Sequence, residues 1–122
     1  KQKKFHLIDS QDAVIGNPAY DLASLIDDVR LKTSNSLKEE MFNHFTKKYF
    51  NRDLKKFEND FLILSVLRNF KILGIFSRLA KRDDKNRYLK YIPYTWSLIK
   101  LRTKNRKVFD ELRLILNNNK FI

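Results

Sequence analysis

Residues 54–81, LKKFENDFLILSVLRNFKILGIFSRLAK, carry the longest apolar pattern in the chain. Their apolar side chains recur every three or four positions, which is the spacing of a helix face. One row, interrupted by an arginine, consists of Phe57, Phe61, Leu64, Arg68, Ile72, Ile75 and Leu79. A second row consists of Leu62, Val66, Phe70, Leu73 and Phe76. With Asp53 as its cap, this pattern predicts a long central helix to about Lys81, in which Gly74 allows a neighbour to approach closely.

Two helices are predicted before the long one. Asn17-Pro18 supplies a helix start, because Asn accepts hydrogen bonds from the first turn and Pro is tolerated there, so a helix is expected over residues 18–31. The helical spacing turns three charged side chains of this helix outward, namely Asp27, Asp28 and Arg30. Ser36-Leu37-Lys38-Glu39 matches a capping box, which predicts a second helix from this point to about Phe50.

Two more helices are predicted after the long one. Asp83-Asp84-Lys85-Asn86 reads as a turn, followed by a helix over residues 88–102 that Pro93 bends or restarts. The last helix covers residues 106–117. Residues 5–8, FHLI, predict a short strand that Asp9 ends. The expected fold is therefore mainly α, with five helices and one short N-terminal strand.

Composition places the chain among packed globular domains. It has 122 residues, of which 43% are hydrophobic, and only two Gly and two Pro. There is no Cys, so disulfides and zinc-thiolate sites are excluded, and an oxidising compartment has no support. The longest uncharged stretch is far shorter than the roughly 20 residues of a membrane-spanning helix. We expect a cytoplasmic protein without a membrane partner.

The charge is strongly positive and uneven. The formal net charge is +12, and residues 62–122, with 15 basic and 4 acidic side chains, account for almost all of it. A basic domain of this kind suggests an anionic partner, so a small helical module that binds nucleic acid is one hypothesis. No helix-turn-helix signature accompanies the charges, and charge runs are usually solvated helix faces. Nucleic-acid binding is therefore kept as the alternative function.

Two aspartates bracket the loop after the predicted strand. Asp9 closes the apolar run, and Asp21 lies in the first turn of the helix that follows. Phosphoryl-transfer enzymes place a magnesium ligand and brace it in this way, since Mg²⁺ prefers hard carboxylate oxygens. An Asp at a strand end is more often a turn or cap residue, so the pattern alone leaves both interpretations open.

Two segments resemble a known family. Residues 8–30, IDSQDAVIGNPAYDLASLIDDVR, resemble the segment after the catalytic loop in the aminoglycoside phosphotransferase and choline kinase-like superfamily, in particular the branch of anomeric kinases of N-acetylmuramate and N-acetylglucosamine. Residues 67–99, LRNFKILGIFSRLAKRDDKNRYLKYIPYTWSLI, resemble later helices of the same branch. The resemblance covers most of residues 5–100. It implies that residues 1–122 are the C-terminal helical, substrate-side part of a protein kinase-like domain.

The resemblance implies roles for several residues in the segment that follows the predicted strand. Asp9 falls on the aspartate that binds Mg²⁺ and thereby contacts the phosphates of ATP. Gln11 or Asp12 would assist the metal through water. Asp21 falls on the aspartate of the family's Asp-Leu-Ala segment, which holds the backbone of the catalytic loop. Ser10 departs from the family, because the branch usually has an aromatic residue there, and this departure suggests a less rigid metal loop.

The resemblance also implies that the catalytic loop and the nucleotide-binding lobe are missing from this chain. The family's catalytic base lies in a His-x-Asp...Asn loop that should precede Phe5, and the nucleotide-binding lobe precedes that loop. Neither His6 nor His44 has the spacing to a partner that a substitute base would need. The chain begins with Lys1, not Met, as if it had been cut from something longer. We therefore expect no catalytic residue within this chain and no turnover by the chain alone.

Further candidates lie on the helices. Arg68 interrupts an apolar stripe, and a buried Arg needs a carboxylate or a ligand. A structural ion pair with Asp12, Asp21, Asp27 or Asp28 is favoured over contact with the substrate. The aromatic side chains Tyr88, Tyr91, Tyr94 and Trp96 could line a sugar or cation site, although helical spacing makes a core role more common.

The expected function combines these points. The chain is predicted to be part of a kinase that uses ATP and Mg²⁺ to phosphorylate a hydroxyl of a sugar or amino sugar. Its partners would be that small-molecule substrate and the N-terminal lobe of the same protein. A polycationic aminoglycoside substrate is disfavoured, since such a substrate needs an acidic pocket and the second half of this chain is basic.

Overall fold

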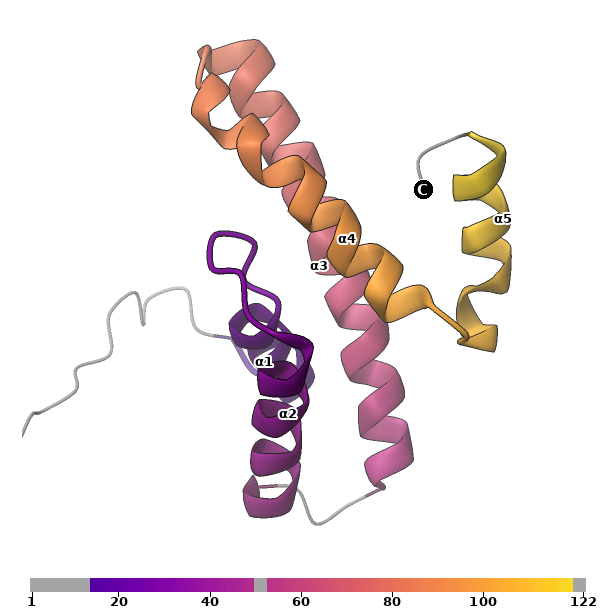
Figure 1. The fold of residues 1–122 in the computed structure, drawn as a ribbon. Coiled ribbons are helices and arrows are strands. Elements are labelled where there is room, and N and C mark those ends of the chain that lie inside the picture. Colours follow the sequence, from indigo (N-terminus) through magenta and orange to yellow (C-terminus); the bar gives the residue numbers. More distant parts are fainter. Residues whose placement is uncertain (1–13, 50–52, 120–122) are drawn as a thin grey trace, which may run out of the picture.

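The structure, a computed structural model, describes residues 14–49 and 53–119, which form five α-helices and two short 3-10 helices (Figure 1). In chain order these are α1 (Pro18–Ile26), α2 (Asn35–Tyr49), α3 (Leu54–Asp83), η2 (Asn86–Tyr91), α4 (Ile92–Thr103), η3 (Lys107–Phe109) and α5 (Asp110–Asn118). The described part contains no strand, so the mainly α prediction is confirmed. The strand predicted over residues 5–8 lies outside the described residues.

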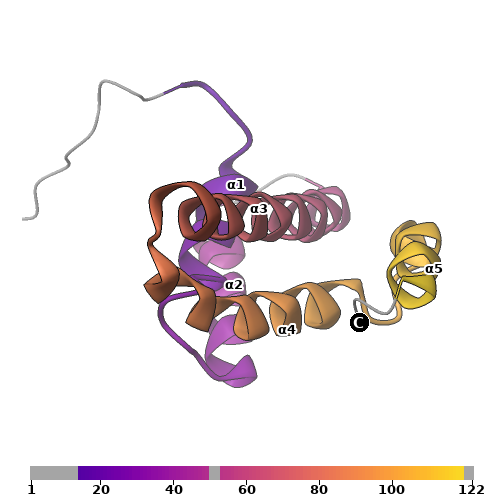
Figure 2. The ribbon, with the colours of Figure 1, turned by 90° about the horizontal axis from the view of Figure 1, so that it is seen from above.

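Helix α3 is the central element, as predicted. Its first turn is capped by Asp53, whose Oδ1 accepts a hydrogen bond of 3.0 Å from the backbone N–H of Lys56. It ends at Asp83, and the next residue, Asp84, is the C-cap and adopts the left-handed conformation with φ 51°. The chain then reverses through η2, and Pro93 lies in the first turn of α4, where it restarts the helix. Helix α4 consequently returns alongside α3 (Figure 2).

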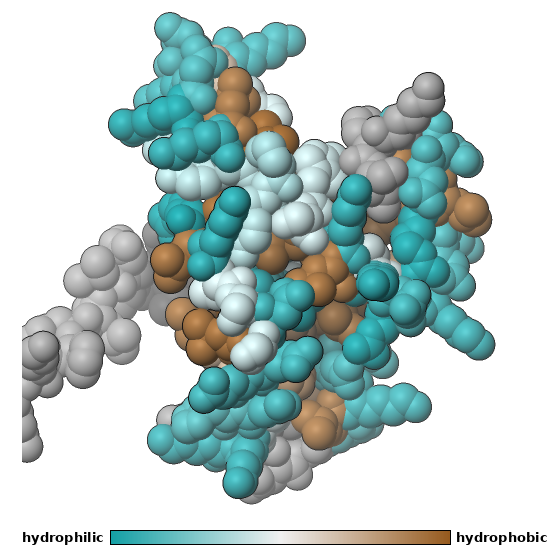
Figure 3. Space-filling view, in the orientation of Figure 1, coloured by the Kyte–Doolittle hydropathy of each residue, from teal (hydrophilic) through white to brown (hydrophobic). Residues whose placement is uncertain are grey.

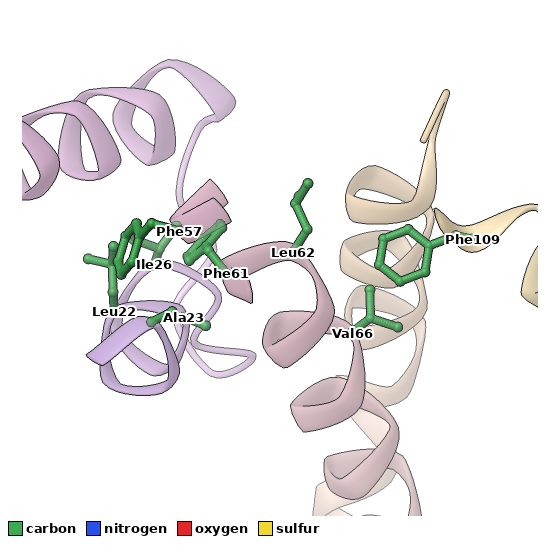
Figure 4. Packing of buried hydrophobic residues seen from close by; sticks show 9 residues of the cluster. Leu22, Ala23, Ile26, Phe57, Phe61, Leu62, Val66 and Phe109 are labelled. Carbon is green, nitrogen blue, oxygen red and sulfur yellow. The ribbon is translucent and has the colours of Figure 1, made fainter. Parts of the chain in front are cut away.

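The main core joins α1, α3 and the segment after α4. The ring of Phe57 on α3 lies beside Ile26 of α1, and Phe109 of η3 lies near Val66 on the other side of α3 (Figure 4). Helix α2 adds Phe42, a partly buried side chain that packs against this core. The buried members of the cluster are Ala19, Leu22, Ala23, Ile26, Phe57, Phe61, Leu62, Val66 and Phe109. This core fixes α1 against the first half of α3.

A second cluster fills the other half of α3. The ring of Phe76 stacks on Tyr88 of η2, with 5.4 Å between the ring centroids. Its buried members are Val29, Ile72, Phe76 and Leu98. Apolar side chains gather mainly in the middle of the face in Figure 3, and hydrophilic ones cover its two ends. Together the two clusters bury side chains from both apolar rows of α3.

Several helix boundaries differ from the prediction, and the helix predicted from residue 106 begins only at Asp110, after the 3-10 helix η3. Helix α1 ends at Ile26, five residues early, because the backbone N–H of Asp27 makes the last helical hydrogen bond and the chain then turns. Helix α2 is capped by Ser34, whose Oγ accepts from the backbone N–H of Leu37 at 3.2 Å. The capping box predicted at Ser36 is therefore wrong, since an earlier serine satisfies the first turn.

Gly74 does not allow a close neighbour, and that prediction is also wrong. It is exposed, and nothing lies within 4 Å of the position that a Cβ would occupy. A Gly within a helix costs about 0.5–1 kcal/mol relative to Ala. We expect Gly74→Ala to raise the free energy of unfolding by about that amount. Urea denaturation of the two chains measures the difference, and a destabilised variant would contradict the open surroundings.

Candidate functional site

Asp27 is a buried acid where α1 ends, although the sequence predicted an outward position. Its side chain is 0% exposed. The cause is the early end of α1, which takes Asp27 off the regular helix face and directs its carboxylate toward α2, α3 and α4. The outward positions predicted for Asp28 and Arg30 are consistent with the structure, because these two form a more exposed ion pair of 3.1 Å.

Three side chains donate hydrogen bonds to the Asp27 carboxylate. Arg102 of α4 binds it through two nitrogens, with Nε to Oδ2 and Nη2 to Oδ1 both 2.8 Å. Lys38 of α2 reaches Oδ1 at 3.1 Å and the backbone carbonyl of Ile26 at 2.6 Å. Ser65 of α3 donates to Oδ2 at 2.6 Å. One carboxylate thus ties together the three helices that surround the end of α1.

The pKa of Asp27 lies below its ordinary value. Burial alone would raise it, but the hydrogen bonds and positive charges of Arg102, with Ser65 and Lys38, outweigh burial. The pKa of Asp27 is lower in the folded chain than in the unfolded chain. The charged carboxylate therefore stabilises the fold at pH values above its unfolded pKa of about 3.9. This contribution is lost as the pH falls through the lower, folded pKa.

The pH dependence follows from that direction. We expect the urea midpoint of the chain to fall as the pH decreases below the unfolded pKa of about 3.9. The urea midpoint of Asp27→Asn should fall less over the same pH range, because this variant lacks the carboxylate whose protonation destabilises the fold. An equally steep fall in both chains would contradict this role of Asp27.

Arg68 lies next to this network without joining it by an ion pair. Its Nη1 donates to the backbone carbonyl of Asp27 at 3.3 Å, and the guanidinium is partly buried. Burial lowers the pKa of Arg68, and nearby Tyr20, Asp28 and Asp27 raise it by less. Among the described residues no carboxylate lies within 4.0 Å of Arg68, so the predicted ion pair with Asp21, Asp27 or Asp28 is not formed.

Asp21 lies on the exposed side of the first turn of α1. In the part of the chain that the structure describes, its carboxylate makes no hydrogen bond or ion pair, and its negative charge suits a helix N-terminus. It lines a cavity of about 400 Å³ with Gly16, Tyr20 and Leu64. Among the described residues, nothing uses the capacity of this carboxylate to accept hydrogen bonds.

Tyr20 connects this cavity with α3. Lys71 of α3 lies over the Tyr20 ring, 5.6 Å from its centroid, and donates to the hydroxyl oxygen at 2.9 Å. Arg68 lies one helical turn before Lys71 on α3. Tyr20, Arg68 and Lys71 thus form a polar surface between α1 and α3. We call these three residues the α1–α3 basic patch.

The aromatic candidates on η2 and α4 belong mainly to the core. Tyr88 and Tyr91 pack on Phe76, and Trp96 meets Phe70 edge to face with 5.9 Å between the ring centroids. Tyr94 packs against the second core cluster. The core interpretation of these residues is supported over a sugar-lining one.

The predicted metal ligands lie outside the described residues. These are Asp9, Gln11 and Asp12, and Ser10 lies among them. Within residues 14–49 and 53–119, no group of three or more His, Cys, Asp or Glu side chains could hold a metal ion. The metal-binding role of Asp9, Gln11 and Asp12 stays a prediction.

Lys38 and Arg102 were missed by the sequence reasoning. Lys38 was placed within a capping box, yet it is 3% exposed, and Arg102 was only the last residue of the helix predicted over residues 88–102. Nothing in the spacing indicated which partners they would meet.

Part of the basic residues of the second half lie where α3 meets η2. Six side chains there are exposed: Arg78, Lys81, Arg82, Lys85, Arg87 and Lys90. Arg82 pairs with Asp83 at 2.6 Å, and this hydrophilic end is visible at the top of Figure 3. The arrangement matches solvated helix ends, and nucleic-acid binding stays an untested alternative.

Known proteins resemble this chain over most of its length. The N-acetylmuramate/N-acetylglucosamine kinase of Caulobacter vibrioides is 36% identical over 90 residues, which are 74% of this chain and 25% of that kinase. The chain is a distant, partial homologue of such kinases. The protein of the same name from Pseudomonas aeruginosa is 29% identical over 116 residues, 90% of this chain and 34% of that protein. The one from Neisseria meningitidis is 31% identical over 93 residues, 71% of this chain and 28% of that protein.

The homology covers a limited part of each kinase. The chain spans about a quarter to a third of the length of the curated relatives it matches. No family model matches it. Among the described helices, none is both long enough and apolar enough to cross a membrane.

Proposed function

We propose that this chain is the C-terminal, substrate-side helical part of an ATP-dependent kinase that phosphorylates a hydroxyl of an N-acetylated amino sugar. The observation that carries the proposal is the similarity of 71–90% of the chain to amino sugar kinases from three different organisms. The parent protein would belong to the aminoglycoside phosphotransferase and choline kinase-like superfamily. The helical fold is consistent with such a part.

Asp9 would hold Mg²⁺ in this proposal. A bound Mg²⁺ would neutralise charge on the phosphates of ATP during transfer. Gln11 or Asp12 would add a contact through water, and the chemistry of these oxygen donors suits Mg²⁺. No residue of this chain is proposed as the base that orients the acceptor hydroxyl, because that group would come from a loop that precedes Phe5 in the parent protein.

Asp21 would brace that catalytic loop. Its carboxylate is exposed, lies in the first turn of α1 and makes no hydrogen bond within the described residues. A free, fixed carboxylate can accept hydrogen bonds from backbone N–H groups of a second segment. The rigid packing of α1 against α3 would hold it in place.

A substrate panel tests the proposal. The complete protein that carries this chain is mixed with ATP and Mg²⁺, and ADP release is measured with N-acetylglucosamine, N-acetylmuramate, choline and an aminoglycoside. We expect release with the amino sugars well above the rate without acceptor. Release with choline or the aminoglycoside alone would assign the protein to another branch, and no release with any acceptor would refute the kinase function.

The alternative is nucleic-acid binding by the basic end of α3 and η2. It predicts a gel shift with duplex DNA or RNA that weakens steeply as salt rises. Absence of a shift at low salt would remove this alternative.

A further inference from the structure

We propose that the α1–α3 basic patch, Tyr20, Arg68 and Lys71, binds the carboxylate of an acidic amino sugar. This inference rests on the proposed function and adds to it the residues that would favour an acidic acceptor over a neutral one. The three side chains come from two helices that the main core holds together. Their relative positions are therefore fixed before any ligand binds.

Charge pairing around the end of α1 leaves this patch with excess positive charge. The cations in this region include Lys38, Arg102, Arg30, Arg68 and Lys71, and Lys32 lies over the Tyr94 ring beside Lys38. Asp27 and Asp28 are already paired with Lys38, Arg102 and Arg30. Asp21, which lines the same cavity as Tyr20, is the one carboxylate beside the patch without an ion pair among the described residues, and its single charge is smaller than the two positive charges of the patch. Among the described residues, neither Arg68 nor Lys71 has a carboxylate within 4.0 Å. An anion would be attracted to these two.

Arg68 has donors to spare. A guanidinium carries five N–H donors in a planar fork, and within the described residues only one of them is used, in the long bond to the carbonyl of Asp27. The group is partly buried, and a poorly hydrated cation gains more from an anion than a fully solvated one does. The fork geometry matches the two oxygens of a carboxylate.

Lys71 and Tyr20 extend the patch beside Arg68. Lys71 lies one helical turn after Arg68 on the same face of α3. It uses one donor on the hydroxyl oxygen of Tyr20 at 2.9 Å, which leaves two ammonium donors and the phenolic O–H available. The patch can therefore offer several donors to one anion.

The proposed function limits which anion this would be. The related kinases are named for two sugars, N-acetylmuramate and N-acetylglucosamine. The first differs from the second by a lactyl ether that ends in a carboxylate. A basic patch on the substrate side discriminates between these two molecules because only one of them carries the charge that the patch attracts.

The test uses this pair of sugars with the complete protein. Arg68→Gln and Lys71→Gln should each lower kcat/KM for N-acetylmuramate by about tenfold or more, since a charge-assisted hydrogen bond is lost. Each should change kcat/KM for N-acetylglucosamine by less than about twofold. Lys71→Arg, which keeps the charge, should restore most of the loss. Arg78→Gln, at an exposed position of the same helix, is the matched control and should change neither value.

The outcomes separate this inference from the proposed function. If the variants lose kcat/KM equally for the two sugars, the patch acts only on structure. If kcat/KM is unchanged in both Arg68→Gln and Lys71→Gln, the patch binds no acceptor. Either result overturns the inference and leaves the kinase function intact. Absence of activity on both sugars in the parent protein would refute the proposed amino sugar kinase function itself. If Arg68→Gln does not fold, the exposed Lys71 variants still decide the question.

Discussion

Asp27→Asn is expected to lower the free energy of unfolding by about 3–5 kcal/mol, because it removes the charge that two buried cations need. Lys38 is 3% exposed and Arg102 has a side chain 14% exposed, so neither can recover full hydration in the folded chain. A loss of this size is a large share of the total stability of a domain, which is usually about 5–15 kcal/mol. The variant should be only marginally folded.

Asp28→Asn is the matched control, since the neighbouring residue has the same chemistry at a more exposed position. Its partner Arg30 has a side chain 68% exposed, and exposed ion pairs contribute about 0–1 kcal/mol. Urea denaturation followed by circular dichroism measures both variants. A similar small loss in the two would show that the Asp27 network does not hold the helices together.

Asp9→Asn in the complete protein is the second large expected effect. If Asp9 holds Mg²⁺ against the phosphates, the amide removes the charge that binds the metal, and kcat should fall by about a thousandfold or more. Asp84→Asn, in the turn after α3, is the control and should keep full activity. Near-normal kcat in Asp9→Asn would exclude the proposed metal role, provided that both variants keep the helical circular dichroism spectrum of the parent.

Periodicity predicted the helices well and their ends less well. The two apolar rows of α3 and its cap at Asp53 follow from local spacing and side-chain chemistry, and both are present. The early end of α1 depends on contacts with residues far along the chain, such as Ser65 and Arg102. Local patterns contain no information about those partners, and Asp27 was therefore placed outside.

The candidate site was predictable to a different degree for each residue. Asp21 was singled out by its place in a recognisable segment. It is exposed, and its bracing role stays a prediction. Arg68 was singled out because a charge interrupts an apolar stripe, but its expected carboxylate partner among Asp21, Asp27 and Asp28 is absent. The reason is competition: Asp27 binds Arg102 and Lys38 instead, and Asp28 binds Arg30.

The central claim is that the chain is part of an amino sugar kinase, and ³¹P NMR of the reaction tests it most directly. The complete protein is incubated with ATP, Mg²⁺ and N-acetylglucosamine or N-acetylmuramate, with the Asp9→Asn variant in parallel. We predict a new sugar-phosphate resonance that grows as ATP is consumed, and no such resonance with the variant. Unchanged ATP and sugar in the presence of the folded parent protein would contradict the claim.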